Sequence, residues 1–399
     1  MTIMAWIGLD DTDHLDGGCT TKNFDNLLIE LEKKYILEQP RLVRLWPFAK
    51  QRTRGNAALT VEINCNNHDE LIKILDAWWN SQILPLKGRI SESKINTRKQ
   101  FPADPGLVYF FEKPNEEFYY SAVSREVSLT ETPTADYSWG GNGIIGATAA
   151  VCWPMKNHTY EAISWRSQHN IGKNIPRVID LEMAKNLDED YDTFMSRDPR
   201  SDNLMIAPRG DCPVLFGLRA RLEQNARNAC EALLESPKTE QTSGYRVFAT
   251  NQATDDHLGE DKQSVVKSIT IKSRGTVVIE TDSDKLIAFA ESGDLKNLAQ
   301  WLKVGDLIQF NGLLALDNTV HLERLMVIEA VPNLARPSCL KCDRKMKSMG
   351  RGQGLKCPIC KATSEDRWDE NPRIPPFNNW VQPPLDSMRH LANQLTGIS

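Results

Sequence analysis

Residues 4–34 read MAWIGLDDTDHLDGGCTTKNFDNLLIELEKK, and this stretch indicates the fold class. Met4–Leu9 is a short apolar run that predicts a strand. Over Lys22–Lys34, apolar residues recur at helical spacing, which predicts an amphipathic helix. The same two patterns return at Ala57–Ile63, a strand, and at His68–Trp79, a helix. We therefore expect an α/β domain that ends near residue 120.

The loop between this first strand and helix carries three carboxylates, Asp10, Asp11 and Asp13. Oxygen ligands directly after a strand can hold Mg²⁺ and present it to phosphates. Gly17–Gly18 then precedes the helix, where free backbone N–H groups favour an anion. A basic segment, Arg52–Asn56, offers positive charge to the same phosphates. The alternative is an Asx-turn loop with a serine or threonine cap and no ligand.

The middle of the chain mixes helices with short strands. Apolar spacing predicts helices at Glu116–Val127 and Leu218–Glu235. The segments predicted as strands are Ile144–Cys152, Tyr160–Trp165, Leu204–Ala207 and Val214–Leu215. Two helices with several strands suit a ferredoxin-like α+β domain.

Short strands dominate after a polar linker at Lys238–Gly244. The predicted strands are Ser268–Lys272, Gly275–Glu280, Leu286–Ala288, Leu307–Leu313 and Val320–Val327. One helix, Asp294–Trp301, is expected among them. Five strands with one inserted helix are typical of an OB-fold barrel, which usually binds oligonucleotides.

Four of the nine cysteines form a CxxC-x14-CxxC pattern, Cys339, Cys342, Cys357 and Cys360. Two such knuckles joined by a hairpin predict a closed, tetrahedral zinc site. The N-terminus becomes acidic too early for a signal peptide, so we expect a cytoplasmic protein whose other cysteines are reduced. A short helix is predicted at Ser387–Leu395, near the end of the chain.

The 399 residues carry a net charge of -5, which excludes a generally polybasic binder. A membrane span is also excluded, because no run of about 18 apolar residues occurs. Positive charge is concentrated between Arg336 and Lys361, where eight basic residues accompany a single acidic one, Asp343. That concentration favours binding of a nucleic-acid backbone over an ordinary solvated surface.

Short motifs along the chain also occur in a recognisable order. They are Asp10–Asp13 with Cys19–Thr21, Arg44-Leu45, Thr53–Asn56, Gly143–Ala147, His158–Glu161, Cys212–Leu215 with Gly217 and Arg219, Asn251-Gln252 with Thr254, Asp255 and His257, the cysteine pattern, and Arg389–Leu391. Together these motifs resemble the tRNA(Ile) 2-agmatinylcytidine synthetase family, TiaS, over nearly the whole chain.

The resemblance implies an ATP-dependent ligase. It would join agmatine, or a related amine, to the 2-carbon of the wobble cytidine of the CAU-anticodon isoleucine tRNA, which then decodes AUA. ATP would end as AMP and two phosphates, and a threonine, by position Thr20, would be autophosphorylated. The implied cofactors are ATP, Mg²⁺ and Zn²⁺, and the implied partners are this tRNA and the amine, with no membrane.

Combining these motifs with the residue patterns gives four groups of candidate residues besides the four zinc-binding cysteines. The catalytic candidates are Asp10, Asp11, Asp13 and Thr20. The candidates for ATP or phosphate binding are Thr12, Gly17, Gly18, Arg52, Thr53, Arg54, Gly55 and Asn56. The candidates for amine binding are Tyr160, Glu161, Asp211, Cys212 and Pro213. The candidates for tRNA binding are Asn251, Gln252, Asp255, His257, Lys345, Lys347, Arg351, Arg389 and His390.

The expected architecture is thus a multidomain α+β protein. Its parts are a kinase-like α/β catalytic domain at 1–120, a ferredoxin-like amine-binding domain at 121–237, an OB-fold tRNA-binding domain at 238–332, a zinc ribbon at 333–365 and a tail with a short helix at 366–399. Three alternatives remain: a non-catalytic RNA-binding protein, an ATP-dependent kinase acting on another RNA or small molecule, or a related ligase that uses a different amine or tRNA. The carboxylate trio and Thr20 argue against the first, because a scaffold does not need them.

Overall fold

The computed structural model describes residues 4–14, 18–51, 56–89, 101–171, 175–208, 210, 212–365 and 368–395. The chain forms two compact units. The first comprises residues 1–259, 314–316 and 384–394, and the second comprises residues 260–313, 317–383 and 395–399. Within the described ranges, no helix has both the length and the apolar character needed to cross a bilayer.

A nine-stranded sheet organises the first unit, with the order β10-β7-β11-β3-β4-β1-β5-β6 and β2 paired to β4. Its strands are β1 (Met4–Asp10), β2 (Ile36–Leu37), β3 (Arg41–Arg44), β4 (Ala57–Asn64), β5 (Gly106–Phe110), β6 (Tyr137–Gly140), β7 (Thr159–Arg166), β10 (Val214–Ala220) and β11 (Thr242–Thr250). All neighbours are antiparallel except β11 and β3, which are parallel. The strands predicted near the N-terminus are therefore central members of one sheet.

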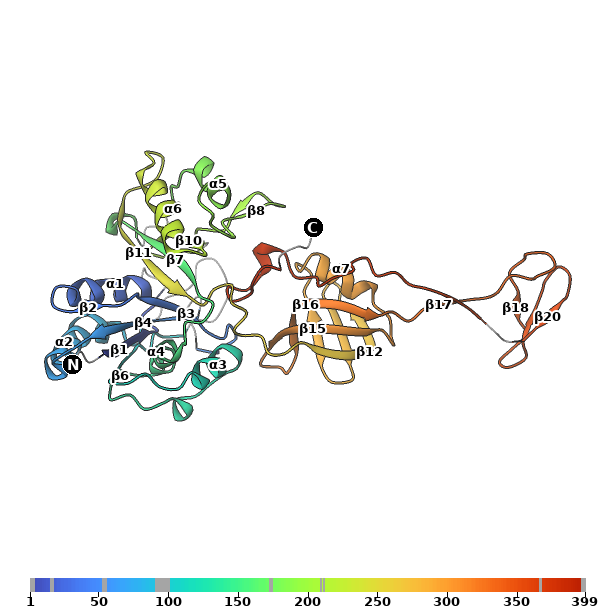
Figure 1. Ribbon diagram of the computed structural model, residues 1–399, viewed down its shortest axis with the longest axis horizontal. Coiled ribbons are helices and arrows are strands. Elements are labelled where there is room, and N and C mark those ends of the chain that lie inside the picture. Colours follow the sequence, from blue (N-terminus) through green and yellow to red (C-terminus); the bar gives the residue numbers. More distant parts are fainter. Residues whose placement is uncertain are drawn as a thin grey trace. The chain divides into compact units, whose positions relative to one another are not determined.

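Helices cover both faces of this sheet (Figure 1). They are α1 (Thr20–Leu31), α2 (His68–Trp78), α3 (Glu117–Ser124), α4 (Gly143–Cys152), α5 (Leu181–Asp190) and α6 (Glu223–Glu235). Short helical turns occur at Trp79–Ile83, Leu84–Leu86, Leu129–Glu131, Gln168–Asn170 and Leu385–Ser387, and a small hairpin pairs β8 (Arg197–Asp198) with β9 (Asn203–Leu204). Alternation along β1 explains the two layers, because Ile7 packs with α1 and α2 whereas Trp6 packs with α4.

The segment Ile144–Cys152, predicted as a strand, is a helix instead. Helix α4 is buried almost throughout, so it lacks the polar face that would reveal a helical period. Its small residues let it lie close to the sheet: a Cβ on Gly146 would collide with Asp10, and one on Gly143 would meet the backbone of Gly106. This close packing between helix and strand is a tertiary property that the apolar run alone does not reveal.

Three other predicted elements also differ from the structure. The helix expected at Leu218–Glu235 begins only at Glu223, because β10 continues to Ala220. The strand expected at Leu204–Ala207 is reduced to β9. The helix expected at Ser387–Leu395 is absent from that described segment, which begins at the end of the 3-10 turn Leu385–Ser387 and contains a further turn at Arg389–Ala392.

The expected domain boundaries also differ from the observed architecture. The segments 1–120 and 121–237 contribute to the same sheet rather than to two separate ones. The segment that begins at residue 238 includes β11, which pairs with β7 and β3 and so belongs to that sheet as well. The second unit begins only at Glu260.

The second unit contains a closed barrel with the order β12-β13-β14-β16-β15. Its strands are β12 (Lys262–Ile271), β13 (Val277–Thr281), β14 (Lys285–Ala288), β15 (Leu307–Leu314) and β16 (Val320–Glu329). Helix α7 (Asp294–Trp301) lies between the third and fourth strands in sequence, and Leu295 and Leu298 pack into the barrel core. All five strands predicted from the sequence are present, some with longer bounds.

A buried ion pair holds the chain that follows the cysteine pattern against this barrel. Asp306 is completely buried and accepts hydrogen bonds from the backbone N–H groups of Lys303 (2.7 Å) and Val331 (2.9 Å). Arg373 donates to both of its carboxylate oxygens, at 2.8 and 3.1 Å. The guanidinium also lies over the ring of Trp301, at 3.9 Å from the centroid.

Replacing Asp306 with Ala is expected to destabilise the barrel by about 3–5 kcal/mol, because it leaves a buried guanidinium without its counter-ion. Hydrogen exchange of the barrel amides in increasing urea measures this loss. Asp282→Ala is the matched control, since Asp282 pairs with Lys267 in an exposed position and should cost less than about 1 kcal/mol. Equal effects of the two substitutions would contradict the structural role assigned to Asp306.

Candidate functional sites

A cavity of about 500 Å³ opens beside the acidic loop that follows β1. Asp10, Asp11 and Asp13 of the loop line the cavity. Thr20, the first residue of α1, lines it as well. The remaining lining residues are Leu45, Trp46, Ala49, Lys50, Gln51, Asn56, Ala57, Ala122, Arg125, Glu126, Val127, Ser128, Leu129, Glu131, Asn142, Gly143, Ile145 and Gly146. The four predicted catalytic residues therefore line one cavity.

The acidic loop is fastened to the N-terminus of α1 by hydrogen bonds. Asp13 Oδ1 accepts from the Thr20 backbone N–H at 2.5 Å and from the Thr20 hydroxyl at 2.9 Å. Thr12 completes the connection, because its N–H donates to Thr20 Oγ1 and its hydroxyl accepts from Asn23. A carboxylate that holds a hydroxyl in this way is placed to receive its proton.

The Asp10 carboxylate lies close to Gly146 of α4. Burial, together with the nearby Asp11 carboxylate, raises the pKa of Asp10 well above its usual range. Asp11 adopts a left-handed backbone conformation, with φ of 54°, and its Oδ2 accepts from the backbone N–H of Asp104 at 2.9 Å. A cation at this site would favour the ionised form of Asp10.

The three carboxylates nevertheless do not converge as ligands of a single ion. Within the described part of the chain, only the four C-terminal cysteines form a group of metal-binding side chains whose ligand atoms all lie within 4.8 Å of one another. Mg²⁺ is commonly held by one or two carboxylates together with substrate phosphates and water. The acidic loop fits that mode better than a cage made by the protein alone.

Helix α4 supplies a part of the cavity that the sequence analysis missed. Its first turn brings the Asn142 side chain and the backbone of Gly143 and Gly146 into the lining, and the N-terminus of a helix favours anions. Asp104 fixes this turn by accepting from the Asn142 N–H at 2.7 Å. The Gly143-x-x-Gly146 spacing is the available signal, but the strand predicted at Ile144–Cys152 conflicts with it.

The residues predicted to bind ATP or phosphate are only partly described. Asn56 lines the cavity and donates to the Trp46 carbonyl at 2.8 Å. Thr12 lies buried beneath the loop, and Gly18 packs against His14. Gly17, Arg52, Thr53, Arg54 and Gly55 lie outside the described residues. The basic side chains described in the cavity are instead Lys50 and Arg125.

The predicted amine-binding residues lie at two different places along β7. Tyr160 and Glu161 are near its start, whereas Cys212 and Pro213 precede β10, whose Val214 pairs with Trp165 near the end of β7. Glu161 and Trp165 are four residues apart, about 13 Å along a strand. Asp211 lies outside the described residues. These residues therefore do not form one compact pocket.

Of these two places, the Cys212 end lies next to α1. Trp165 Nε1 donates to Thr21 Oγ1 at 3.0 Å, and the Pro213 carbonyl accepts from the Arg166 N–H at 2.7 Å. The Cys19 thiol also contacts Thr21, at 3.0 Å. The end of β7 and the loop before β10 are thereby held beside the N-terminus of α1.

Glu161 belongs to a buried polar cluster. Its carboxylate accepts from Gln252 at 2.5 Å and pairs with Arg44 at 3.4 Å. His390 bonds to the Gln252 side-chain oxygen at 3.1 Å, so the buried Gln252 bridges the carboxylate and the imidazole. Glu161 is already engaged by protein groups, which weakens its assignment as the carboxylate for a substrate guanidinium.

Several of the residues predicted to bind tRNA make structural contacts within the first unit. Asn251 is completely buried and bonds to both the N–H and the carbonyl of Arg44, at 2.7 and 2.9 Å. Asp255 accepts from the Asn393 N–H at 2.7 Å, and His257 is also buried. Arg389 lies over the Phe48 ring at 4.6 Å. Asn251, Gln252 and His257 are buried, whereas Asp255 and Arg389 are half-buried and His390 is exposed. Their contacts fasten residues 384–394 to the rest of the first unit.

His390 makes the attachment of this tail sensitive to acid. The Arg44 guanidinium, together with Arg219, holds the pKa of His390 below its usual range although the residue is exposed, so the folded protein favours the neutral imidazole. An unfolded histidine has a pKa of about 6.5. The contribution of neutral His390 to the stability of the tail is therefore present above about pH 6.5. It is lost on acidification, because the His390 imidazole takes up a proton in the unfolded state at a higher pH than in the folded state.

Lowering the pH from 7 to 5 is expected to destabilise the tail by less than about 1 kcal/mol, because solvent screens the exposed imidazole. Hydrogen exchange of the Ala253 and Asp255 amides, which donate to the His390 and Leu391 carbonyls, measures this effect. His390→Gln should remove most of the pH dependence, whereas His169→Gln, at an exposed position, should leave it unchanged. Identical pH profiles for all three proteins would refute the assignment.

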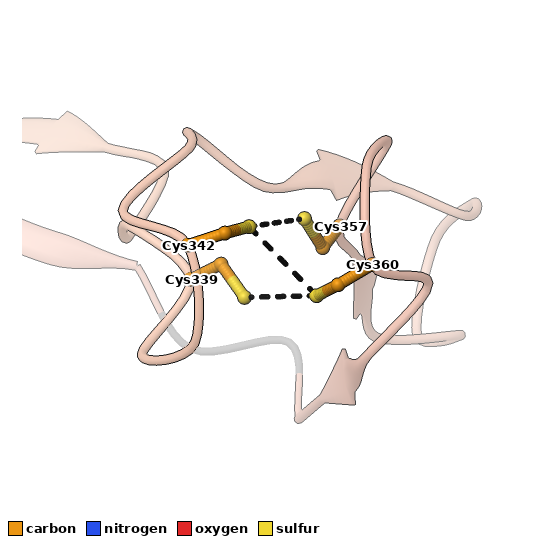
Figure 2. Close-up of side chains that lie close together, drawn as sticks. All are labelled: Cys339, Cys342, Cys357 and Cys360. Atoms are coloured by element: carbon orange, nitrogen blue, oxygen red, sulfur yellow. Dashed lines mark hydrogen bonds between the residues drawn. The ribbon is translucent and has the colours of Figure 1, made fainter.

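The four C-terminal cysteines form a compact cluster (Figure 2). Their sulfurs are 3.5 Å apart for Cys339 and Cys360, 3.3 Å for Cys342 and Cys357, and 3.8 Å for Cys342 and Cys360. A tetrahedral zinc ion with bonds of about 2.3 Å separates its sulfur ligands by about 3.8 Å. The cluster therefore fits a structural zinc ion.

Each half of this cluster has the same backbone geometry. Asp343 and Lys361, which follow the second cysteine of each pair, adopt left-handed conformations with φ of 52° and 60°. The Lys341 backbone N–H lowers the pKa of the Cys339 thiol, which favours the thiolate that zinc requires. Short strands frame the cluster: β17 (Asn333–Ala335), β18 (Lys347–Ser348), β19 (Leu355–Lys356), β20 (Thr363–Ser364) and β21 (Asp369–Asn371).

The positive charge of this ribbon is fully presented to solvent. The exposed basic residues are Arg336, Lys341, Arg344, Lys345, Lys347, Arg351, Lys356 and Lys361. Three of them, Lys345, Lys347 and Arg351, were predicted to bind tRNA, and their exposure agrees with that prediction without testing it. Eight exposed cations suit contact with phosphates.

The fold and these sites define a multidomain α/β protein with an acidic cavity at a helix N-terminus and a C-terminal zinc ribbon. Three family profiles match it: the TiaS TCKD domain over residues 6–136, the TiaS FLD domain over residues 141–257, and the TiaS C-terminal zinc ribbon domain over residues 336–372. The chain belongs to the TiaS family, as the relatives described next also show.

The curated relatives extend this similarity over nearly the full length. The isoleucine-tRNA 2-agmatinylcytidine synthetase TiaS of Cenarchaeum symbiosum is 30% identical, with coverage of 97% of this chain and 91% of the relative. The enzyme of the same name from Archaeoglobus fulgidus is 27% identical, with 98% and 97% covered. The crystal structure of a TiaS complex with an isoleucine tRNA and ATP superposes with a TM-score of 0.81 at 25% identity, covering 100% of this chain and 98% of the other.

Proposed function

We propose that this protein is an ATP-dependent ligase that joins agmatine to the wobble cytidine of the CAU-anticodon isoleucine tRNA. The observation that carries the proposal is the near full-length match to enzymes named as 2-agmatinylcytidine synthetases of an isoleucine tRNA, combined with an acidic cavity built around Thr20. A cytoplasmic location accords with a tRNA substrate.

ATP is proposed to bind in the cavity beside the acidic loop. Mg²⁺ would be held by Asp10, Asp11 or Asp13 together with the phosphates, and it would neutralise charge as a phosphoryl group moves. The dipole of α4 favours the phosphates near its N-terminus, while Lys50 and Arg125 add positive charge. Arg52 and Arg54 remain candidates for the same task.

Thr20 is the proposed phosphoryl acceptor, with Asp13 as its base. Its hydroxyl lines the cavity and already donates to Asp13. Thr21 is the neighbouring alternative, but its hydroxyl oxygen bonds to Trp165 and contacts Cys19 instead. This difference in surroundings favours Thr20.

The reaction at the wobble cytidine depends on the group that leaves its 2-carbon. The 2-carbonyl oxygen of cytidine departs poorly, whereas a phosphorylated oxygen departs as phosphate when an amine attacks the carbon. ATP would supply the phosphoryl group and end as AMP and two phosphates. The loop at Cys212 and Pro213, beside the N-terminus of α1, is the proposed location of the amine.

The second unit is proposed to bind the tRNA. The closed five-stranded barrel, with a helix between its third and fourth strands, supports an OB-fold, a common oligonucleotide binder. The zinc ribbon adds exposed positive charge for the backbone. A purely RNA-binding role is disfavoured by the Asp13–Thr20 arrangement, which has no task in a passive binder.

Mass spectrometry of nucleosides after incubation with ATP, agmatine and the tRNA transcript tests the proposal directly. The expected product is agmatine-conjugated cytidine at the wobble position, with AMP formed in equal amount. Asp11→Asn should abolish both products while leaving tRNA binding within about twofold, because asparagine tolerates the left-handed backbone. Binding of the tRNA with no new nucleoside would instead support the passive RNA-binding role.

Replacing Thr20 with Ala is expected to eliminate both the phosphoprotein and the modified nucleoside. Thr21→Ala is the matched control and should retain phosphorylation, since its hydroxyl points to Trp165. Phosphopeptide mapping after reaction with labelled ATP distinguishes the two positions. Label that persists in Thr20→Ala would move the acceptor elsewhere.

A further inference from the structure

Asp104 does not line the cavity beside the acidic loop, but it connects two of the cavity walls. Its backbone N–H donates to Asp11 Oδ2 at 2.9 Å. Its side-chain Oδ2 accepts from the Asn142 N–H at 2.7 Å, and its carbonyl accepts from the Gly143 N–H at 2.9 Å. One residue therefore fastens both the acidic loop and the first turn of α4.

Glycines make this connection a close one. A Cβ on Gly141 would collide with both carboxylate oxygens of Asp104, and one on Gly143 would collide with the backbone nitrogen of Gly106. The Asp104 carboxylate thus lies directly against the turn, with no space for another side chain between them. The turn cannot shift toward or away from the acidic loop unless its contact with Asp104 changes.

The same part of α4 positions groups that line the cavity. Gly146 packs so closely against Asp10 that a Cβ there would collide with the carboxylate. The Asn142 side chain donates to Gln51 Oε1 at 2.8 Å, and both of these residues line the cavity. A displacement of the first turn would therefore reach Asp10 and Gln51 together.

The hydrogen bond, rather than the negative charge of Asp104, carries this connection. The carboxylate pairs with Lys87 at 3.4 Å, but the two side chains are 28% and 48% exposed. Solvent screens an ion pair of this kind, so it contributes little. The side-chain amide of asparagine also offers an oxygen that can accept the bond from the Asn142 N–H.

We propose that Asp104 is a positioning residue for phosphoryl transfer to Thr20. Its side-chain oxygen holds the first turn of α4 against the acidic loop, and it thereby fixes Asp10 and Asp11 in the cavity. This proposal rests on the proposed function.

Phosphoryl transfer depends on this alignment more than nucleotide binding does. The Thr20 hydroxyl oxygen forms a bond to a phosphorus atom of ATP, its proton passes to Asp13, and the bond from that phosphorus to the departing nucleotide oxygen breaks. A misplacement of about 1 Å can slow a reaction about 100-fold. Affinity for ATP comes from contacts spread over the whole cavity, so the loss of one positioning contact should change it much less.

The experiment measures Thr20 phosphorylation by labelled ATP in the full-length protein, without tRNA or amine. The rate at saturating ATP reports on alignment, and the ATP concentration that gives half of this rate reports on binding. The variants are Asp104→Ala and Asp104→Asn. Asp104→Ser serves if the alanine protein does not fold, because the serine oxygen lies one bond closer to the backbone and does not reach the Asn142 N–H.

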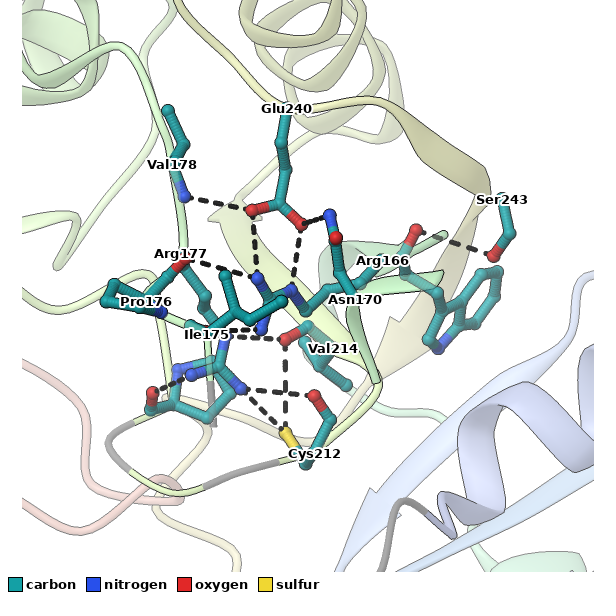
Figure 3. A network of polar contacts seen from close by, with 12 residues as sticks. Arg166, Asn170, Ile175, Pro176, Arg177, Val178, Cys212, Val214, Glu240 and Ser243 are labelled. Carbon is teal, nitrogen blue, oxygen red and sulfur yellow. Dashed lines mark hydrogen bonds and ion pairs between the residues drawn. The ribbon is translucent and has the colours of Figure 1, made fainter. Parts of the chain in front are cut away.

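Two control variants change side chains that do not line the cavity. Asp136→Ala is the matched control, because Asp136 Oδ2 also accepts a backbone N–H, that of Phe111, at 2.8 Å. Asn170→Ala is the control for stability. Asn170 donates to the Glu240 carboxylate at 3.1 Å, in the polar network around Arg166 (Figure 3). Both controls should keep the wild-type rate, whatever they cost in stability.

In Asp104→Ala, the rate at saturating ATP is expected to fall at least about tenfold. The half-saturating ATP concentration should stay within about twofold of the wild-type value, since binding and alignment are separate. Asp104→Asn should restore the rate to within about threefold of the wild type, because its amide oxygen accepts the Asn142 N–H.

A wild-type rate in Asp104→Ala would overturn the proposal, and so would a failure of Asp104→Asn to restore the rate. A higher half-saturating ATP concentration at an unchanged rate would also overturn it, since Asp104 would then act on binding. If the wild type leaves Thr20 unlabelled, the proposed phosphoryl acceptor fails instead. Hydrogen exchange of the Asn142 amide then decides whether Asp104 holds the turn: exchange should be faster in Asp104→Ala, and equal exchange in both proteins would overturn the connection.

Discussion

The parallel pairing of β11 with β3 is the constraint on which the first unit depends. Ala249 and Thr250 pair with Arg41 and Leu42, and the Asn251 side chain then continues the ladder by bonding to both backbone groups of Arg44. Without this joint, the strands on either side would form two separate sheets with exposed edges. With the β11–β3 pairing, residues more than two hundred positions apart in sequence belong to one hydrogen-bonded sheet.

This joint also determines where the chemical groups meet. Because β7 lies next to β11, its two ends are placed at different points along the sheet. The start of β7 brings Glu161 to Arg44 and Gln252, where a buried cluster fastens the C-terminal tail. The end of β7 brings Trp165 to Thr21 at the N-terminus of α1. One strand thus separates a structural cluster from the proposed reactive region.

Close packing around the acidic loop complements this arrangement. Gly146 of α4 leaves room for the Asp10 carboxylate, and the consequence is a carboxyl group whose ionised form is disfavoured by burial. Asp13 has a different environment, since it is satisfied by two hydrogen bonds from Thr20. Neighbouring carboxylates in unlike surroundings are suited to different tasks, one with a cation and one with a proton.

The sequence by itself determined the features whose signals are local. The CxxC pairs, the barrel strands and the β1–α1 unit depend on spacing and period, so the residue order alone predicted them. Only tertiary structure decided that Ile144–Cys152 is a helix, because a segment buried on all sides loses its periodic pattern. Asn251, Gln252 and His390 were predicted to bind tRNA from the family resemblance, which carries no information on their contacts in this fold. Their partners come from distant strands, and only the joined sheet shows that those side chains are already satisfied.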